Sequence, residues 1–264
     1  MINHEIPSCP ICDAARTLAF RHTLLKKHVC DYYHCAGCGS LQTQEPHWID
    51  EAYGSAISRL DTGVLSRNIR IADILSLLMP YVARGNGRFL DVAGGYGILT
   101  RLMRDRGFDF HWSDKYCENL FARGFEGHDD LPYDVISAFE VLEHVTDPVG
   151  FVSTAMNQSR ARTLVFSTEL YTGSPPAPDE WWYYAFESGQ HVSFYQRRTL
   201  HKIAERLGLK CFAGKSIHVL TDKQLSPLAL RLLTNGPFAS MLSPAVRVLQ
   251  RSRTMSDHVE LSER

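Results

Sequence analysis

Neither sign of charge dominates this sequence of 264 residues, which has 28 basic and 29 acidic side chains and a formal net charge of −1. No overall field would draw it onto a polyanion, and this argues against nucleic acid as a partner. The sequence also lacks a run of about 18 apolar residues, and its first residues, MINHEIPSCPIC, lack the basic and apolar regions of a signal peptide. We therefore expect no membrane span and a cytoplasmic location.

The cysteines do not form the even set of a disulfide framework, because there are seven of them and four fall into two C-x-x-C pairs. The spacing between the pairs lets two knuckles meet and offer four thiolates to a structural zinc ion. The expected ligands are Cys9, Cys12, Cys35 and Cys38. Such an ion would stabilise a short segment that has no core of its own, whereas the alternative is a flexible arm with reduced cysteines.

Hydrophobic residues make up 44% of the chain, enough to bury a full core. Short apolar runs alternate with amphipathic helices, which predicts an α/β fold with a Rossmann-like, doubly wound, mostly parallel sheet. The predicted strands are 88–93, 109–113, 134–138, 163–167 and 210–219. The predicted units are a zinc-ribbon-like segment (1–46), a helical cap (47–82), the sheet domain (83–221) and a helical extension (222–264) that frays after Arg251.

A glycine-rich turn follows the first predicted strand of the sheet domain, in the segment RFLDVAGGYGILT. Asp91 precedes the glycines, and the third glycine of G-x-G-x-x-G is missing, so that the pattern departs from that of a dinucleotide-binding loop. A carboxylate at this point would repel a pyrophosphate but not a sulfonium cation. Asp114 ends the second strand, where it can accept hydrogen bonds from two ribose hydroxyls.

This pattern resembles the first motif of the class I S-adenosylmethionine-dependent methyltransferases, acid-x-G-x-G-x-G, with Ala93 in place of the first glycine. The resemblance covers roughly residues 81–220. It implies that Asp91 to Gly97 bind the methionine and adenosine portions of the cofactor and that Asp114 binds the ribose. The expected cofactor-binding residues are Asp91, Ala93, Gly94, Gly95, Gly97, Asp114, Phe139 and Glu140.

An E-x-x-E-H segment follows the predicted strand 134–138, at the edge where doubly wound sheets bind their ligands. On a helix, Glu140, Glu143 and His144 would share one face. Two roles remain open: His144 as a general base beside the hydroxyl to be methylated, or the three side chains as ligands of a divalent cation. Purely structural packing is the third reading.

The segment FEVLEHVTDP resembles that of ubiquinone-biosynthesis O-methyltransferases, and E-x-x-E-H also recurs in small-RNA 3′-terminal 2′-O-methyltransferases. In the RNA enzymes the pattern implies a magnesium site that a later histidine completes. The candidate here is His191, so the expected catalytic residues are Glu143, His144 and His191, and the expected second metal site consists of these three with Glu140. The aromatic run 181–186 either lines an apolar acceptor pocket or packs in a core.

Together these features predict an S-adenosylmethionine-dependent methyltransferase that modifies a hydroxyl of a small molecule or glycan. Two-knuckle segments similar to residues 9–42 precede methyltransferase domains that act on sugars and secondary metabolites. The enzymatic alternative is therefore C-methylation of a nucleotide-linked sugar. The alternative from another class is a non-catalytic zinc-ribbon binding module on a methyltransferase-like fold. The identity of the acceptor and the oligomeric state cannot be read from the sequence, because specificity resides in variable loops.

Overall fold

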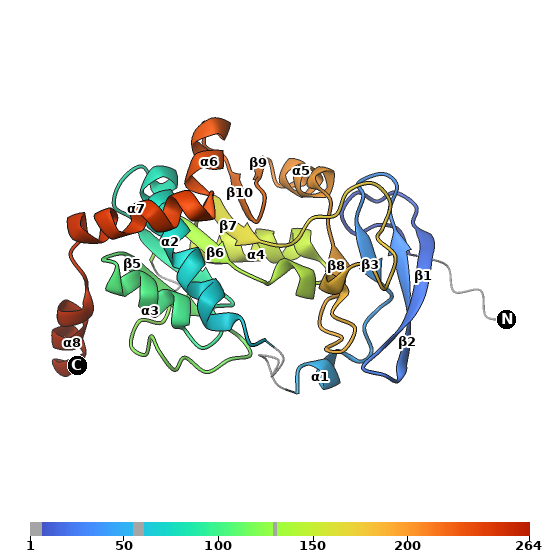
Figure 1. Ribbon diagram of the computed structural model, residues 1–264, viewed down its shortest axis with the longest axis horizontal. Coiled ribbons are helices and arrows are strands. Elements are labelled where there is room, and N and C mark those ends of the chain that lie inside the picture. Colours follow the sequence, from blue (N-terminus) through green and yellow to red (C-terminus); the bar gives the residue numbers. More distant parts are fainter. Residues whose placement is uncertain (1–6, 55–60, 129–130) are drawn as a thin grey trace.

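Two β-sheets organise the chain in the computed structural model, which describes residues 7–54, 61–128 and 131–264 (Figure 1). The larger sheet has the strand order β5-β4-β6-β7-β10-β9, and the smaller has the order β1-β2-β3-β8. The strands of the larger sheet are β4 (Arg88–Val92), β5 (Asp109–Ser113), β6 (Val135–Ala138), β7 (Thr163–Ser167), β9 (Lys210–Ala213) and β10 (Ile217–Thr221). Those of the smaller are β1 (Thr17–Leu24), β2 (His28–His34), β3 (Leu41–Thr43) and β8 (Ser193–Phe194).

The larger sheet is doubly wound. Strands β5, β4, β6 and β7 run parallel, and every residue of β6 and β7 is buried, as expected of strands covered on both faces. One face packs against α2 (Val64–Ala83), α3 (Ile98–Asp105) and α7 (Gly236–Leu249). The other packs against α4 (Pro148–Ser159) and α5 (Arg197–Arg206). The predicted Rossmann-like α/β class is thus confirmed.

The predicted strand 210–219 is wrong in one respect, because the structure divides it into β9 and β10. The two strands pair antiparallel, and β10 also runs antiparallel to β7. The chain reverses at Gly214, where a Cβ atom would collide with the carbonyl group of Ile217. An isolated glycine inside a strand pattern indicates a bulge or a close backbone approach, so the residues on either side of Gly214 were predicted as one strand.

The segment predicted as a helical cap contains α1 (Ile49–Ala52) and α2. Helix α2 is not a separate cover: its buried side chains, including Leu75 and Met79, share a core with Phe89 and Val135 of the large sheet. It therefore forms one layer of the principal domain. None of the helices in the described part of the chain is long and apolar enough to cross a membrane.

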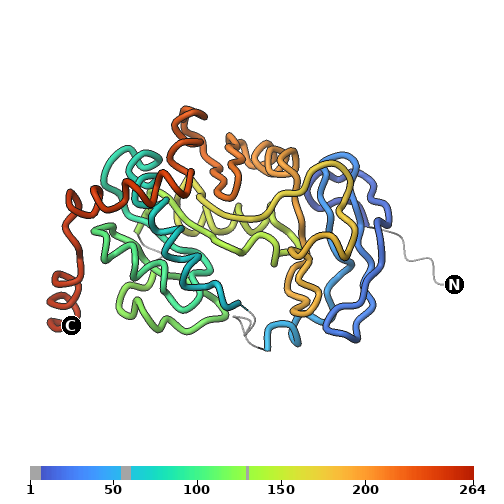
Figure 2. Tube along the Cα trace, in the orientation of Figure 1, coloured from blue at the N-terminus to red at the C-terminus, as the bar shows by residue number. Residues whose placement is uncertain are grey.

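The small sheet combines N-terminal residues with a distant segment. Strand β3 pairs with β8, in the register Leu41 with Phe194 and Gln42 with Ser193. Figure 2 shows the chain leaving the large sheet after β7, entering the blue N-terminal region and returning. We call residues 7–53 the N-terminal module. Its core contains Tyr183 and Tyr184 of the aromatic run, which settles their packing role, whereas Trp182 is 77% exposed.

The C-terminal residues form α6 (Pro227–Leu233), α7 and α8 (Thr254–Ser262). The expectation that the chain frays after Arg251 is wrong, because α8 is held by a buried ion pair: Asp257 accepts hydrogen bonds from Arg104 at 2.7 and 2.8 Å and from Arg101 at 2.8 Å. Both partners lie about half the chain away in sequence. No local pattern could have indicated this contact.

Candidate active site

The glycine-rich loop lies between β4 and α3, at the carboxyl edge of the parallel strands. Ala93, Gly95 and Gly97 have positive φ angles of 57°, 56° and 85°. A Cβ atom on Gly97 would meet Asn119 Oδ1 at 2.6 Å, so this position requires glycine on two grounds. Ala93 adopts the left-handed conformation with a side chain, at a cost on the order of 1 kcal/mol. The N–H groups of the loop glycines donate hydrogen bonds within the protein, and these bonds hold the loop in its shape.

The two acids predicted to bind the cofactor lie on either side of this loop. Asp91 is 2% exposed, and the Ser137 hydroxyl donates a hydrogen bond to its Oδ1 at 2.7 Å. Burial raises the pKa of Asp91 to about 7, the Ser137 bond opposes this rise, and the charge of Asp114 adds to it. Asp114 Oδ2 accepts a hydrogen bond from Gly95 N at 2.9 Å. The two carboxyl groups and the glycine-rich loop therefore lie together at the carboxyl edge of the sheet.

The E-x-x-E-H segment does not form the single helical face that its spacing predicts. Only the short 3₁₀ helix η1 (Leu142–His144) is present, and Glu140 lies before it with a φ of 56°. Glu140 Oε1 accepts a hydrogen bond from Ser167 Oγ at 2.5 Å, and its Oε2 lies 3.9 Å from Arg67 Nε. This conformation separates Glu140 from the other two residues. Phe139, just before it, packs partly buried against the core of the sheet.

Glu143, His144 and His191 do converge, although His191 lies far along the chain. One ligand-type atom of each lies within 4.8 Å of the others. The rings of His144 and His191 are 4.8 Å apart and nearly perpendicular, at 88°. His144 Nδ1 contacts the Gln190 carbonyl oxygen at 3.1 Å, and His191 Nδ1 contacts that of Tyr183 at 2.7 Å. Because carbonyl oxygens only accept, Nδ1 carries the hydrogen in both rings and Nε2 retains a free lone pair.

Burial dominates the electrostatics of this cluster. Glu143 is fully buried, and neither of its carboxylate oxygens has a hydrogen-bond partner of normal geometry. Burial raises the pKa of Glu143 to about 8, and the charge of Glu140 adds to the rise. Burial lowers the pKa of His144 to about 3, with a contribution from His191, and lowers that of His191 to about 4. The Tyr183 and Thr168 hydroxyls oppose the rise in the pKa of Glu143, and neutral imidazoles lie beside its carboxyl group.

The four predicted zinc ligands also converge. The Sγ atoms of Cys9 and Cys38 are 3.6 Å apart, those of Cys12 and Cys35 are 3.4 Å apart, and all four lie within 4.8 Å of one another. Tetrahedral zinc with Zn–S bonds of about 2.3 Å requires S···S distances of about 3.8 Å. All four are free thiols rather than disulfides. The donor set and its spacing fit zinc.

Three residues near the histidine cluster were not predicted. Gln190 donates from Nε2 to the Ala52 carbonyl oxygen at 2.8 Å, while its own carbonyl accepts from His144. Tyr53 directly follows α1, and its ring lies 6.1 Å from that of His144. The Gln42 side chain donates to the carbonyl of Thr146 at 3.0 Å and to Ser193 Oγ at 2.9 Å. Gln42 reaches this place through the pairing of β3 with β8, which no local pattern shows.

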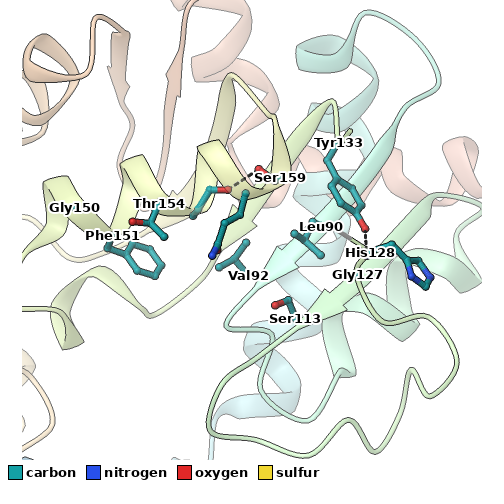
Figure 3. Close-up of a pocket in the computed structure, with 12 residues that line it drawn as sticks. Leu90, Val92, Ser113, Gly127, His128, Tyr133, Gly150, Phe151, Thr154 and Ser159 are labelled. Atoms are coloured by element: carbon teal, nitrogen blue, oxygen red, sulfur yellow. Dashed lines mark hydrogen bonds between the residues drawn. The ribbon is translucent and has the colours of Figure 1, made fainter. Parts of the chain in front are cut away.

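A cavity of about 290 Å³ lies between α4 and the face of β4 and β5 (Figure 3). Val92 and Ser113 line it, and each immediately precedes a residue of the predicted cofactor set. Phe151 and Thr154 form the wall on the side of α4. His144 and His191 are not among its lining residues. The cavity therefore adjoins the glycine-rich loop and not the histidine cluster.

The sheet and its glycine-rich loop define a Rossmann-like α/β protein. Residues 66–213, more than half of the chain, match the family of methyltransferase domains, and the chain belongs to this family. It is therefore a methyltransferase. No curated protein matches the chain.

Three solved structures illustrate the likeness in fold. Magnesium protoporphyrin IX methyltransferase from Synechocystis PCC 6803 with bound SAH is 13% identical, with 65% of this chain and 90% of that chain covered and a TM-score of 0.40. An O-methyltransferase family protein from Burkholderia thailandensis is 13% identical, with coverage of 69% and 65% and a TM-score of 0.47. Mitomycin 7-O-methyltransferase is 16% identical, with coverage of 65% and 60% and a TM-score of 0.44.

Proposed function

We propose that this methyltransferase transfers the methyl group of S-adenosylmethionine to a hydroxyl oxygen of a small molecule or glycan. The observation that carries the choice of oxygen is the convergence of Glu143, His144 and His191. Asp91, the glycine turn and Asp114 support S-adenosylmethionine as the donor, because they offer anionic groups and close backbone approach to a cationic cofactor. A nucleotide-linked sugar methylated at carbon is the enzymatic alternative, and analysis of the methylated product separates the two.

The cofactor supplies an electrophilic methyl group, so the protein has two remaining tasks. It must align the acceptor oxygen with the methyl carbon, and it must accept or displace the hydroxyl proton. Asp114 is tied to Gly95 and would hold the ribose, whereas Asp91 lies buried beneath the loop. The histidine cluster, which follows β6, would serve the acceptor. The glycine-rich loop and the segment Glu143–His144 follow the carboxyl ends of the neighbouring parallel strands β4 and β6, which supports this assignment.

The histidine cluster fits a divalent cation better than it fits a metal-free base. Two imidazole Nε2 lone pairs and the buried carboxyl group of Glu143, which can bind a cation once deprotonated, form a suitable donor set, and carbonyl groups fix both rings through Nδ1. Such a cation, when bound, would lower the pKa of an acceptor hydroxyl. Without one, burial holds the pKa of His144 at about 3, too low for an efficient base near neutral pH. Glu140 bonds to Ser167 and stands outside this set.

Binding measurements on three proteins test the proposal: the wild type, Glu143→Gln and, as a matched control, Glu140→Gln. Isothermal titration with S-adenosylmethionine tests the proposed methyl donor, and absence of binding by the wild type would contradict that proposal. Titration of chelator-treated protein with Mn²⁺ tests the cation, with zinc content measured in parallel. We expect Glu143→Gln to lose at least about 100-fold in Mn²⁺ affinity, and Glu140→Gln to lose less than about fivefold. Equal Mn²⁺ affinity in the wild type and in Glu143→Gln would contradict the proposed cation site.

We also propose that Cys9, Cys12, Cys35 and Cys38 hold a structural zinc ion. Four sulfur ligands leave no open coordination position, so this site would serve folding rather than catalysis. The alternative of a non-catalytic binding module predicts zinc without any affinity for S-adenosylmethionine. Zinc content and the cofactor titration together decide between the two.

A further inference from the structure

Tyr53 lies where the N-terminal module meets the two ligand sites proposed above. Its ring stacks on Tyr116, with centroids 5.7 Å apart and 24° between the planes. It also meets the ring of His144 edge-on at 6.1 Å. Tyr116 donates its backbone N–H to Asp114 Oδ1 at 2.7 Å and is itself 68% exposed. The Tyr53 ring therefore contacts both the acceptor-side imidazole and Tyr116, the residue that binds the ribose-side acid.

The position of Tyr53 is fixed by its surroundings. Its backbone N–H donates to the Ile49 carbonyl oxygen at 3.0 Å, which closes α1. The preceding carbonyl, that of Ala52, accepts from Gln190, the same residue whose carbonyl orients His144. Burial raises the pKa of the Tyr53 phenol, and the charges of Glu143 and Asp114 both add to this rise. The phenol is thus within electrostatic reach of acids from both sites.

The covalent structure of S-adenosylmethionine determines which of its groups would lie next to Tyr53. The sulfur is bonded to the 5′ carbon of the ribose and carries the methyl group that must reach the acceptor. If Asp114 holds the ribose and His144 faces the acceptor, the sulfonium lies between them, where Tyr53 is found. The face of an aromatic ring attracts a cation electrostatically. A tyrosine at this point would therefore stabilise the charged donor.

We propose, on the basis of the function proposed above, that Tyr53 is a further cofactor-binding residue whose ring covers the sulfonium of S-adenosylmethionine. Tyr116 supports the ring from behind. This contact would favour the cationic donor over the neutral thioether product, S-adenosylhomocysteine. It would also make the N-terminal module part of the donor site, although the glycine-rich loop belongs to the large sheet.

The test compares the affinities of S-adenosylmethionine and S-adenosylhomocysteine in the full chain, and it needs no knowledge of the acceptor. The variants are Tyr53→Phe, which keeps the ring, and Tyr53→Leu, which removes it. Tyr33→Leu, in β2 of the same module, controls for general effects on the module. We expect Tyr53→Leu to weaken S-adenosylmethionine about tenfold and S-adenosylhomocysteine less than threefold, and Tyr53→Phe to stay within about twofold for both.

Two results would overturn the inference. If Tyr53→Leu lowers the affinity for both ligands equally, the ring covers the cofactor without a contact to its charge. If both affinities stay unchanged, the ring does not contact the cofactor. Zinc content and thermal unfolding of each variant identify a loss that arises from an unfolded module. A wild-type protein that binds neither ligand would instead reject the proposed methyl donor, and the inference with it.

Discussion

If Asp91 binds the cofactor as proposed, its carboxyl group should make cofactor binding dependent on pH. Burial raises its pKa to about 7, so the group is ionised above that value and protonated below it. Only the carboxylate attracts a cationic ligand. We therefore expect the affinity for S-adenosylmethionine to rise as pH increases through about 7 and to fall by up to about tenfold per unit below it. Isothermal titration between pH 5.5 and 8.5 measures this profile.

Two variants assign the profile to Asp91. Asp91→Asn removes the titrating group and should give weaker, pH-independent binding. Ser137→Ala removes the hydrogen bond of 2.7 Å that favours the carboxylate, so it should shift the midpoint to higher pH. A wild-type affinity that does not change across this range, or that increases on acidification, would contradict the assignment.

Local sequence identifies the residues of the site better than their arrangement. Asp91 lies near the end of β4 and Asp114 directly follows β5, and this pattern was enough to predict both acids at one edge of the sheet. The same kind of reasoning placed Glu140 with Glu143 on a helical face, and it did not foresee the positive φ angle that separates them. It also could not reveal Tyr53, whose partners are 63 and 91 positions away in Tyr116 and His144. Spacing predicts neighbours only where the backbone conformation is known.

The pairing of β3 with β8 determines where His191 lies. Val192 N donates to the Glu143 carbonyl oxygen at 2.7 Å, and Ser193 pairs with Gln42 in the small sheet. The Gln42 amide joins Thr146 to Ser193, and Ser193 Oγ donates to the Val145 carbonyl oxygen at 2.6 Å. This buried amide therefore holds the segment after His144 against the segment after His191.

Gln42→Leu tests this positioning role, because it keeps the approximate volume and removes both donors. We expect the affinity of the histidine cluster for Mn²⁺ to fall about 10- to 100-fold, while the affinity for S-adenosylmethionine changes less than twofold. Gln44→Leu is the matched control: Gln44 Oε1 accepts a hydrogen bond from Asp31 N within the same module and does not contact the cluster. Similar loss of Mn²⁺ affinity in both variants would show that the effect comes from module stability alone.

At the scale of elements, burial decided which strands could be predicted. The strands β6 and β7 are buried throughout, and their apolar runs predicted them to within one residue. The hairpin of β1 and β2 was not predicted, because β1 is largely exposed and its sequence, TLAFRHTL, lacks a strong apolar pattern. The stability of such a hairpin comes from the pairing and from the aromatic core behind it, which includes Tyr184 and Phe194 of the distant segment.

The whole molecule joins the large sheet and its helices to the N-terminal module, whose core is a separate hydrophobic cluster. Helix α5 of the sheet domain contacts the second knuckle directly: Thr199 donates to the Cys38 carbonyl oxygen at 2.8 Å, and Arg198 to that of Ala36 at 2.9 Å. The module in turn contributes Gln42, which bonds to the segments that follow the two histidines, and Tyr53, whose ring stacks on that of Tyr116. Zinc at the cysteines would thus act on both ligand sites through the fold.

Removal of zinc should therefore affect the N-terminal module and the large sheet differently. Chelation, or Cys35→Ser, is expected to unfold the module while the large sheet and its helices keep most of the far-ultraviolet circular dichroism. Mn²⁺ binding should be lost because β3 no longer holds β8 and His191. Binding of S-adenosylmethionine should weaken about tenfold, as in Tyr53→Leu, because the glycine-rich loop remains and only the ring is lost.

Cys211→Ser, outside the cysteine cluster, is the control. If the zinc-free protein keeps full Mn²⁺ affinity, the module does not organise the histidine cluster, and the large sheet alone positions His191.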